Sequence, residues 1–210
     1  MDNLLFSFVD LGQNIKNGLT SSLGLLWFNI LINFIGAVAI LVKVVETQNK
    51  KRTKIVFFAV INYFLWITYF ILNGDFTAAV VNGISFVQLL IFLQRGNKKW
   101  ADSIIWLVVF ILAQVVAGFF TWADPYSLFS ITAGILSTIA YYVMNEKLYR
   151  YFFLALITFW IFNGIARGYV IALIHDVFAF VSILIAIIRY NFKKVDANKA
   201  EVDNANTNEG

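Results

Sequence analysis

Long apolar runs separated by short polar connections dominate the pattern of this chain. Each run is close to the about 20 residues that an α-helix needs to cross a bilayer, and its apolar residues are continuous rather than alternating as in barrel strands. The pattern therefore predicts an all-α integral membrane protein. We expect seven spans, at Leu23–Val42, Ile55–Leu72, Phe76–Leu93, Ser103–Trp122, Ser127–Val143, Tyr149–Ile165 and Tyr169–Ile188.

The two ends of the chain differ from this pattern. In residues 1–22 the apolar side chains recur at helical spacing on one face, which predicts an amphipathic helix lying on the membrane surface. A polar leader without that role is the alternative. Residues 195–210 are polar, Asn-rich and free of aromatic side chains, so we expect a disordered tail.

The composition supports a membrane protein. Hydrophobic residues make up 60% of the chain and charged residues 13%, which leaves too little polar surface for a water-soluble domain of this size. The chain has no cysteine, which excludes a disulfide scaffold and thiol-based metal sites.

The positive charges are distributed unevenly between the two sides of the predicted bundle. With seven spans, 14 of the 16 Lys and Arg residues fall on the side that carries the connections after spans one, three and five and the C-terminus. Only Lys16 and Arg167 fall on the other side. The positive-inside rule then predicts a cytoplasmic C-terminus and an N-terminus outside. The net charge of +4 thus indicates orientation rather than nucleic-acid binding.

The chain contains an internal repeat. Shifting it by 94 residues without gaps gives ten identities in the 30 positions Trp66–Arg95, among them Trp66 with Trp160 and Gly74 with Gly168. Spans two and three therefore recur as spans six and seven, and one extra crossing keeps the two copies parallel.

This repeat predicts the domain plan. Two parallel three-helix repeats, residues 23–95 and 126–190, are joined by a linker helix at residues 103–122. Parallel repeats of this kind occur in transporters, whose solute sites lie near the midplane at the repeat interface. The alternative is a bundle that arose by duplication and has only a structural role.

Ionisable residues inside a membrane span are costly and point to function. Asp176 lies in the seventh span next to His175, the only histidine of the chain, and its repeat partner in the third span is Asn82. We interpret Asn82 and Asp176 as facing walls of a solute site. The alternative is an interhelical hydrogen bond that only fixes packing, and the direction of His175 stays open.

Three further residues are candidates for the same cavity. Trp66 and Trp160 are related by the repeat and would act as stacking platforms, or else belong to the aromatic belt of the membrane interface. Asn62 in the second span is either a cavity residue or a packing contact. The sequence offers no catalytic triad, metal cluster or nucleic-acid module, so we expect no enzyme, cofactor, metal or nucleic-acid partner.

Three segments resemble the YgjV family of bacterial inner-membrane proteins: YFLWITYFILNGDFTAAVVNGISFVQLLIFLQR, DPYSLFSITAGILSTIAYYVMNEKLYRY and FWIFNGIARGYVIALIHDVFAFVSILIAIIRY. The resemblance spans roughly residues 25–190 and implies a location in the bacterial inner membrane. More distantly, the helix plan is similar to the SWEET sugar transporters and the PnuC vitamin-precursor transporters. In SWEETs an asparagine on the third helix and another on the seventh flank the sugar; here Asn82 falls at the first position, and Asp176 replaces the second.

Together these observations predict a small-solute transporter or facilitator that works by alternating access. A sugar, a nucleoside or a vitamin precursor would bind between the two helix triplets. The alternative is a non-transporting membrane receptor or assembly protein on the same scaffold. The expected partners are the solute and the lipid bilayer, and assembly into a homo-oligomer stays open.

Overall fold

The computed structural model describes the backbone of residues 2–48, 52–143 and 145–207. Within these residues every regular element is helical, which confirms the all-α prediction. The eight α-helices are α1 (Asp2–Leu23), α2 (Leu25–Gln48), α3 (Arg52–Leu72), α4 (Phe76–Phe92), α5 (Ile105–Phe120), α6 (Ser127–Tyr142), α7 (Glu146–Arg167) and α8 (Val170–Thr207), and a short 3₁₀-helix, η1 (Lys99–Asp102), precedes α5.

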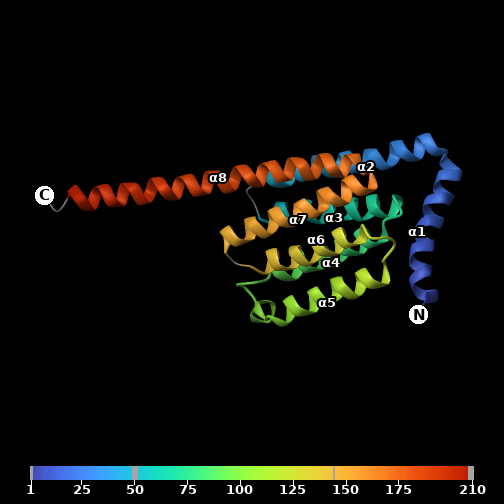
Figure 1. Ribbon diagram of the computed structural model, residues 1–210, viewed down its shortest axis with the longest axis horizontal. Helices are drawn as coiled ribbons and strands as arrows, with labels where there is room; N and C mark the ends of the chain where they lie inside the picture. Colours follow the sequence, from blue (N-terminus) through green and yellow to red (C-terminus); the bar gives the residue numbers. More distant parts are fainter. Residues whose placement is uncertain (1, 49–51, 144, 208–210) are drawn as a thin grey trace.

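Helices α2 to α8 run side by side in one bundle, and α1 lies across one end of it (Figure 1). Each helix triplet packs in chain order, with α3 between α2 and α4 and with α7 between α6 and α8. Two seams join the triplets: an extensive one between α4 and α6, and a lighter one between α2 and α8. Helix α5 packs outside the extensive seam, against α4 and α6.

The helices differ in how well they match the thickness of a bilayer. Among the described residues, three candidate spans are both long and apolar enough to cross: Leu25–Val45, Lys147–Arg167 and Val170–Ile188. The apolar helices α4, α5 and α6 are shorter, at 17, 16 and 16 residues. At 1.5 Å per residue, the latter two are about 24 Å long against a hydrocarbon core of about 30 Å.

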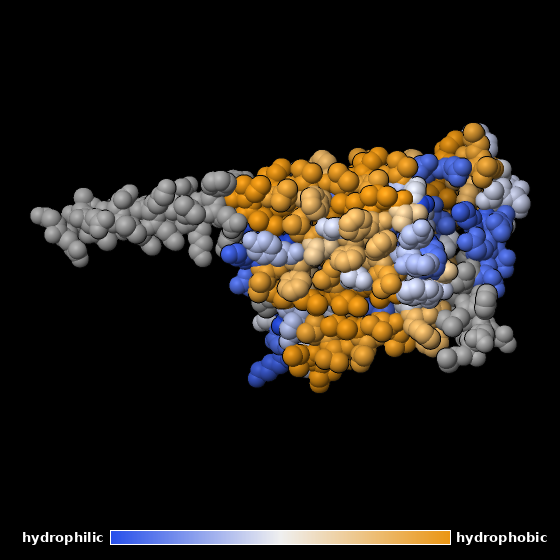
Figure 2. Space-filling model, viewed as in Figure 1, coloured by the Kyte–Doolittle hydropathy of each residue, from blue (hydrophilic) through white to orange (hydrophobic). Residues whose placement is uncertain are grey.

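The bundle has an apolar exterior and a partly polar interior. Exposed apolar side chains cover its flank between more polar ends (Figure 2), and Leu26 and Phe178 are each 68% exposed. In contrast, the side chains of Gln88, Gln114 and Thr138 are fully buried. A large exposed apolar surface around buried polar groups is what a lipid environment favours.

Two glycines related by the 94-residue shift end their helices in the same way. Gly74 follows α3 and Gly168 follows α7, and both adopt the left-handed backbone, with φ of 79° and 71°. Glycine adopts this conformation without the strain that a Cβ would cause, and it is a common end for a helix. The matched glycines therefore have the same backbone role in the two halves of the chain.

Composition and backbone differ for the C-terminal tail, whose disorder stays a prediction. Helix α8 continues to Thr207, although the composition predicts disorder from residue 195. Nothing in this segment ends a helix, because it has no proline and no glycine before Gly210. At the other end α1 confirms the predicted helix, while its location on a membrane surface stays a prediction. Lys50 and Lys51, predicted to lie in a basic connection, fall outside the described residues.

Candidate functional site

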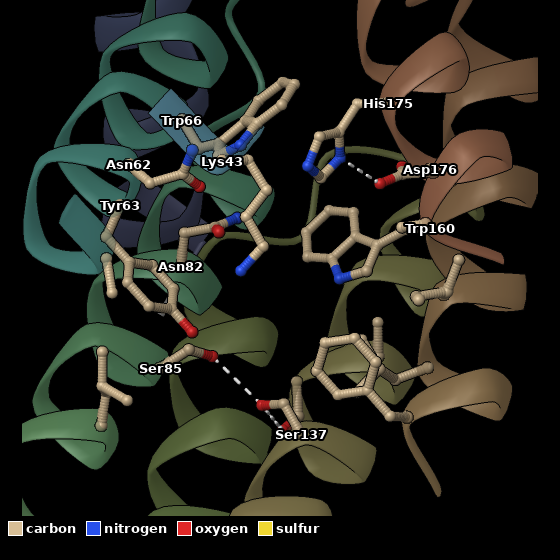
Figure 3. Close-up of a pocket in the computed structure, with 18 of the residues that line it drawn as sticks. Lys43, Asn62, Tyr63, Trp66, Asn82, Ser85, Ser137, Trp160, His175 and Asp176 are labelled. Carbon is tan, nitrogen blue, oxygen red and sulfur yellow. Dashed lines mark hydrogen bonds and ion pairs between the residues drawn. The ribbon is translucent and has the colours of Figure 1, made fainter. Parts of the chain in front are cut away.

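A cavity of about 270 Å³ lies between the two helix triplets. Its walls come from α2, α3 and α4 on one side and from α6, α7 and α8 on the other (Figure 3). All six solute-binding candidates from the sequence line it: Asn62, Trp66, Asn82, Trp160, His175 and Asp176. Its volume is close to the lower limit of small-molecule sites, roughly 300 Å³. The structure thus brings the six together, and their role in binding stays a prediction.

Two asparagines on the wall formed by α2, α3 and α4 are each held by a hydrogen bond from the side-chain nitrogen. Nδ2 of Asn62 donates to the carbonyl of Ala39 in α2 at 2.7 Å, and Nδ2 of Asn82 donates to the carbonyl of Ala78 one turn earlier at 2.9 Å. An amide side chain held in this way has its carbonyl oxygen left for another partner. Both asparagines can therefore accept a hydrogen bond from a solute.

The acid and the histidine face this wall from the first turns of α8. Nδ1 of His175 and Oδ1 of Asp176 are 2.9 Å apart, and the two side chains are 18% and 13% exposed. The ring of Trp66 packs against the imidazole, with centroids 4.9 Å apart. The direction of His175, which the sequence left open, is therefore toward the cavity and its acid neighbour.

The second nitrogen of this histidine is the most informative atom of the site. Nε2 of His175 is buried and has no hydrogen-bond partner among the described residues. Buried polar atoms are almost always paired, and an exception at a cavity wall calls for water or a ligand. The imidazole therefore offers a hydrogen-bonding group to whatever occupies the cavity.

Five aromatic rings form a layer that closes the cavity toward the end of the bundle where α1 lies. Trp66, Tyr69 and Phe70 come from α3, Trp160 comes from α7, and Tyr169 comes from the turn before α8. Phe70 stacks on Trp160 with centroids 5.5 Å apart, and Tyr69 meets Tyr169 edge to face at 6.0 Å. Trp66 and Trp160 thus belong to this aromatic layer, in which rings from both triplets meet.

Lys43 is a cavity residue that the sequence analysis missed. Hydropathy ends the first span at Val42 and places Lys43 in the following connection, whereas α2 continues to Gln48. The lysine side chain extends into the cavity, across from His175 and Asp176 (Figure 3). A long aliphatic stem lets lysine stay in an apolar helix while its ammonium reaches a polar space. The cavity therefore carries one ammonium and one carboxylate, those of Lys43 and Asp176.

Hydrogen bonds between side chains join the triplets along the α4–α6 seam. The hydroxyls of Ser85 and Ser137, which also line the cavity, are 3.2 Å apart. Next to them Nε2 of Gln88 donates to Oγ1 of Thr138 at 2.6 Å. Bonds of this kind between apolar helices are specific contacts in a lipid environment. This seam is one polar attachment between the two halves of the bundle.

A buried ion pair, also missed by the sequence analysis, joins the triplets near the aromatic layer. Asp75 precedes α4 and its side chain is 1% exposed; Nε of Arg167, at the end of α7, lies 3.1 Å from Oδ2. Nη2 of Arg167 lies 3.0 Å from Oδ1 of Asp124, and the Tyr169 hydroxyl donates to Oδ2 of Asp75 at 3.5 Å. Burial raises the pKa of the Asp75 carboxyl, and the positive charge of Arg167 opposes this rise.

Comparison with known proteins identifies the family of this chain. It belongs to the Imp-YgjV family of bacterial inner membrane proteins, whose family model matches residues 30–194. This confirms the resemblance inferred from the sequence, together with the inner-membrane location that it implies. No curated protein and no solved structure matches the chain. The more distant likeness to SWEET and PnuC transporters stays a prediction.

Proposed function

We propose that this protein is a small-solute transporter or facilitator of the bacterial inner membrane. The solute binds in the cavity between the two triplets and reaches each side of the membrane in turn. One observation carries the proposal: Asn82, His175 and Asp176, from different triplets, converge on a cavity inside an otherwise apolar bundle. Ionisable groups are expensive at such a place and mark solute or ion pathways.

The paired features of the two halves support seven spans arranged as parallel repeats. Both triplets pack in chain order, and the glycines that end α3 and α7 match in conformation. Asp75 and Tyr169, which are one repeat length of 94 residues apart, are in contact with each other. Residues related by a two-fold axis touch only near that axis, so this contact favours an axis along the bundle, as in parallel-repeat transporters.

The orientation of the protein follows from the charge distribution. Helices alternate in direction along the bundle, so the ends that carry most Lys and Arg residues lie together at one end (Figure 1). In our proposal this end is cytoplasmic and the end where α1 lies is outside. The aromatic layer then closes the outer end of the cavity.

The cavity chemistry favours a polar solute without net charge. The amide oxygens of Asn62 and Asn82 and the carboxylate of Asp176 accept hydrogen bonds, and the ammonium of Lys43 donates them. The indole of Trp160 offers a face for a ring. A solute with hydroxyl, carbonyl or amino groups on a compact or ring-shaped body fits this arrangement, which describes sugars, nucleosides and vitamin precursors.

A thermal-shift screen of the purified protein tests the proposal. A solute present at 100 times its dissociation constant stabilises the protein by about 2.7 kcal/mol, which raises Tm by roughly 5–10 °C in a chain of this size. The shift should disappear in Asp176→Asn and in Asn82→Leu but persist in Lys147→Met, a change at an exposed residue. A stoichiometric protein partner together with no solute-induced shift would favour a receptor or assembly protein instead.

A further inference from the structure

A second hollow lies on the other side of the aromatic layer. This outer groove has a volume of about 480 Å³ and is formed by the start of α2, the end of α3 and the turn between α7 and α8. Three asparagines, Asn29, Asn33 and Asn73, supply amide groups to it. None of the nine residues that line it carries a charge. The groove therefore suits an uncharged or zwitterionic solute that forms hydrogen bonds.

The groove and the cavity share the aromatic layer as a common wall. Tyr69 and Tyr169 line the groove, whereas Trp66, Phe70 and Trp160 line the cavity. Tyr69 and Trp66 meet edge to face with centroids 5.3 Å apart, so a single thickness of rings separates the two spaces. Because rings from both triplets form the layer, separation of the triplets at this end would open it.

The seam between α2 and α8 is the place where such a separation is easiest. Helix α2 approaches α8 at Gly36, where an added Cβ would lie 2.5 Å from Cγ2 of Ile171 and 3.2 Å from the ring of Tyr69. This contact is between apolar groups, while the α4–α6 seam includes the hydrogen bond from Gln88 to Thr138. Parting Gly36 from Ile171 itself breaks no hydrogen bond, so the direct α2–α8 contact costs less to separate than the hydrogen-bonded α4–α6 seam.

The ion pair of Asp75 and Arg167 holds this end closed. It connects the α3–α4 turn of one triplet to the end of α7 in the other, and Tyr169 of the aromatic layer bonds to the same carboxylate. If Arg167 is removed, a buried carboxylate is left without its counter-charge. Water can reach that carboxylate only from the groove, when this end is open. Loss of the Arg167 charge therefore favours the open form, in which the carboxylate is solvated.

From these observations we propose that the outer groove is the external solute-binding site and the mouth of the transport path. It takes solutes without net charge that carry hydroxyl, carbonyl or amide groups. The groove joins the cavity when α2 and α8 part between Gly36 and Ile171, with α4–α6 as the hinge. The proposal rests on the proposed transport function, but access to the cavity can be measured without any solute.

The chain has no native cysteine, so engineered cysteines are its only thiols that a thiol reagent can modify. An Ala179→Cys change on α8 places a reporter on the cavity wall. A Gly36→Cys, Ile171→Cys pair places two thiols across the seam, because a Cβ at position 36 lies 3.3 Å from the Cβ of Ile171, near the range of about 3.5–4.5 Å found in disulfides. Replacing Ile171 also removes the Cγ2 that would collide.

The full-length protein in spheroplasts is treated from outside with a membrane-impermeant, positively charged methanethiosulfonate reagent. With the pair reduced, the reporter should react; with the pair oxidised, its reaction from outside should fall to the rate of the protein without the reporter, and a reductant should restore it. Reaction from the cytoplasmic side, in inverted vesicles, should be the same in both states. A pair that does not cross-link, or one that cross-links without slowing the outside reaction, overturns the proposal.

Two further variants test the ion pair. Arg167→Gln should speed the outside reaction of the reporter roughly tenfold or more, and adding Asp75→Asn should reverse most of this gain, because no uncompensated charge is left. An unchanged rate in Arg167→Gln, or the same rate in the double variant, would refute the ion pair as the closing contact. Since no solute enters these measurements, a missing solute would count against the proposed function alone.

Discussion

Replacing Arg167 with methionine tests the buried ion pair at the outer end. The change keeps much of the aliphatic volume of the side chain but leaves the carboxylate of Asp75, which is 1% exposed, without its nearest cation. Removing one partner of a buried ion pair costs about 3–5 kcal/mol, because the other charge stays desolvated. In a chain of this length each kcal/mol lowers Tm by about 2–4 °C, so we expect a loss of roughly 10 °C.

The matched second change removes the cause of this loss. Asp75 also accepts a hydrogen bond from the backbone N–H of Ala78 at the start of α4, a capping role that asparagine fills equally well. The double variant Arg167→Met, Asp75→Asn should therefore recover most of the lost stability, since replacing both charges by neutral groups is often close to neutral. Lys147→Met, at an exposed cation, is the control and should change stability by no more than about 0.5 kcal/mol.

Thermal unfolding of the purified proteins in one detergent, followed by the fluorescence of the six tryptophans, gives the four Tm values. Equal losses in the single and double variants would show that the desolvated carboxylate is not the cause. A Tm of Arg167→Met no lower than that of the lysine control would refute the buried pair itself.

Two further predictions follow from the remaining features. Gln114 is fully buried and neither polar atom of its amide has a partner among the described residues, so Gln114→Leu should raise Tm by roughly 2–6 °C; a lower Tm would contradict this. A single cysteine at the exposed residue Asn17 should react with an impermeant reagent only from outside, and one at the exposed residue Asn97 only from the cytoplasm. The reverse result would show that the orientation is inverted.

The helices and the cavity walls could be predicted because both depend on periodic features of the sequence. Apolar runs of membrane-crossing length define the helices, and the 94-residue repeat fixes which positions share a depth and a face. Asn82 and Asp176 were matched on that ground, and the structure places them on facing walls of one cavity. Trp66 and Trp160, another matched pair, line the same space.

Contacts without a periodic signal were missed. Lys43 follows the last apolar residue of its run, and hydropathy alone cannot show that the helix continues past it. Asp75 and Arg167 are far apart in the sequence, and their pairing depends on how the ends of α3 and α7 meet. A signal was available in hindsight, because both residues stand next to the matched glycines Gly74 and Gly168 at equivalent turns.

The most direct test of the account is solute uptake by the purified protein in proteoliposomes. Sugars, nucleosides and vitamin precursors without net charge are supplied outside, and uptake is compared for the wild type, Asp176→Asn, Asn82→Leu and the Lys147→Met control. We predict that at least one solute enters, that both cavity variants slow its entry, and that the control does not. A transported solute whose uptake is unaffected by both cavity variants would contradict the claim that this cavity is the transport site.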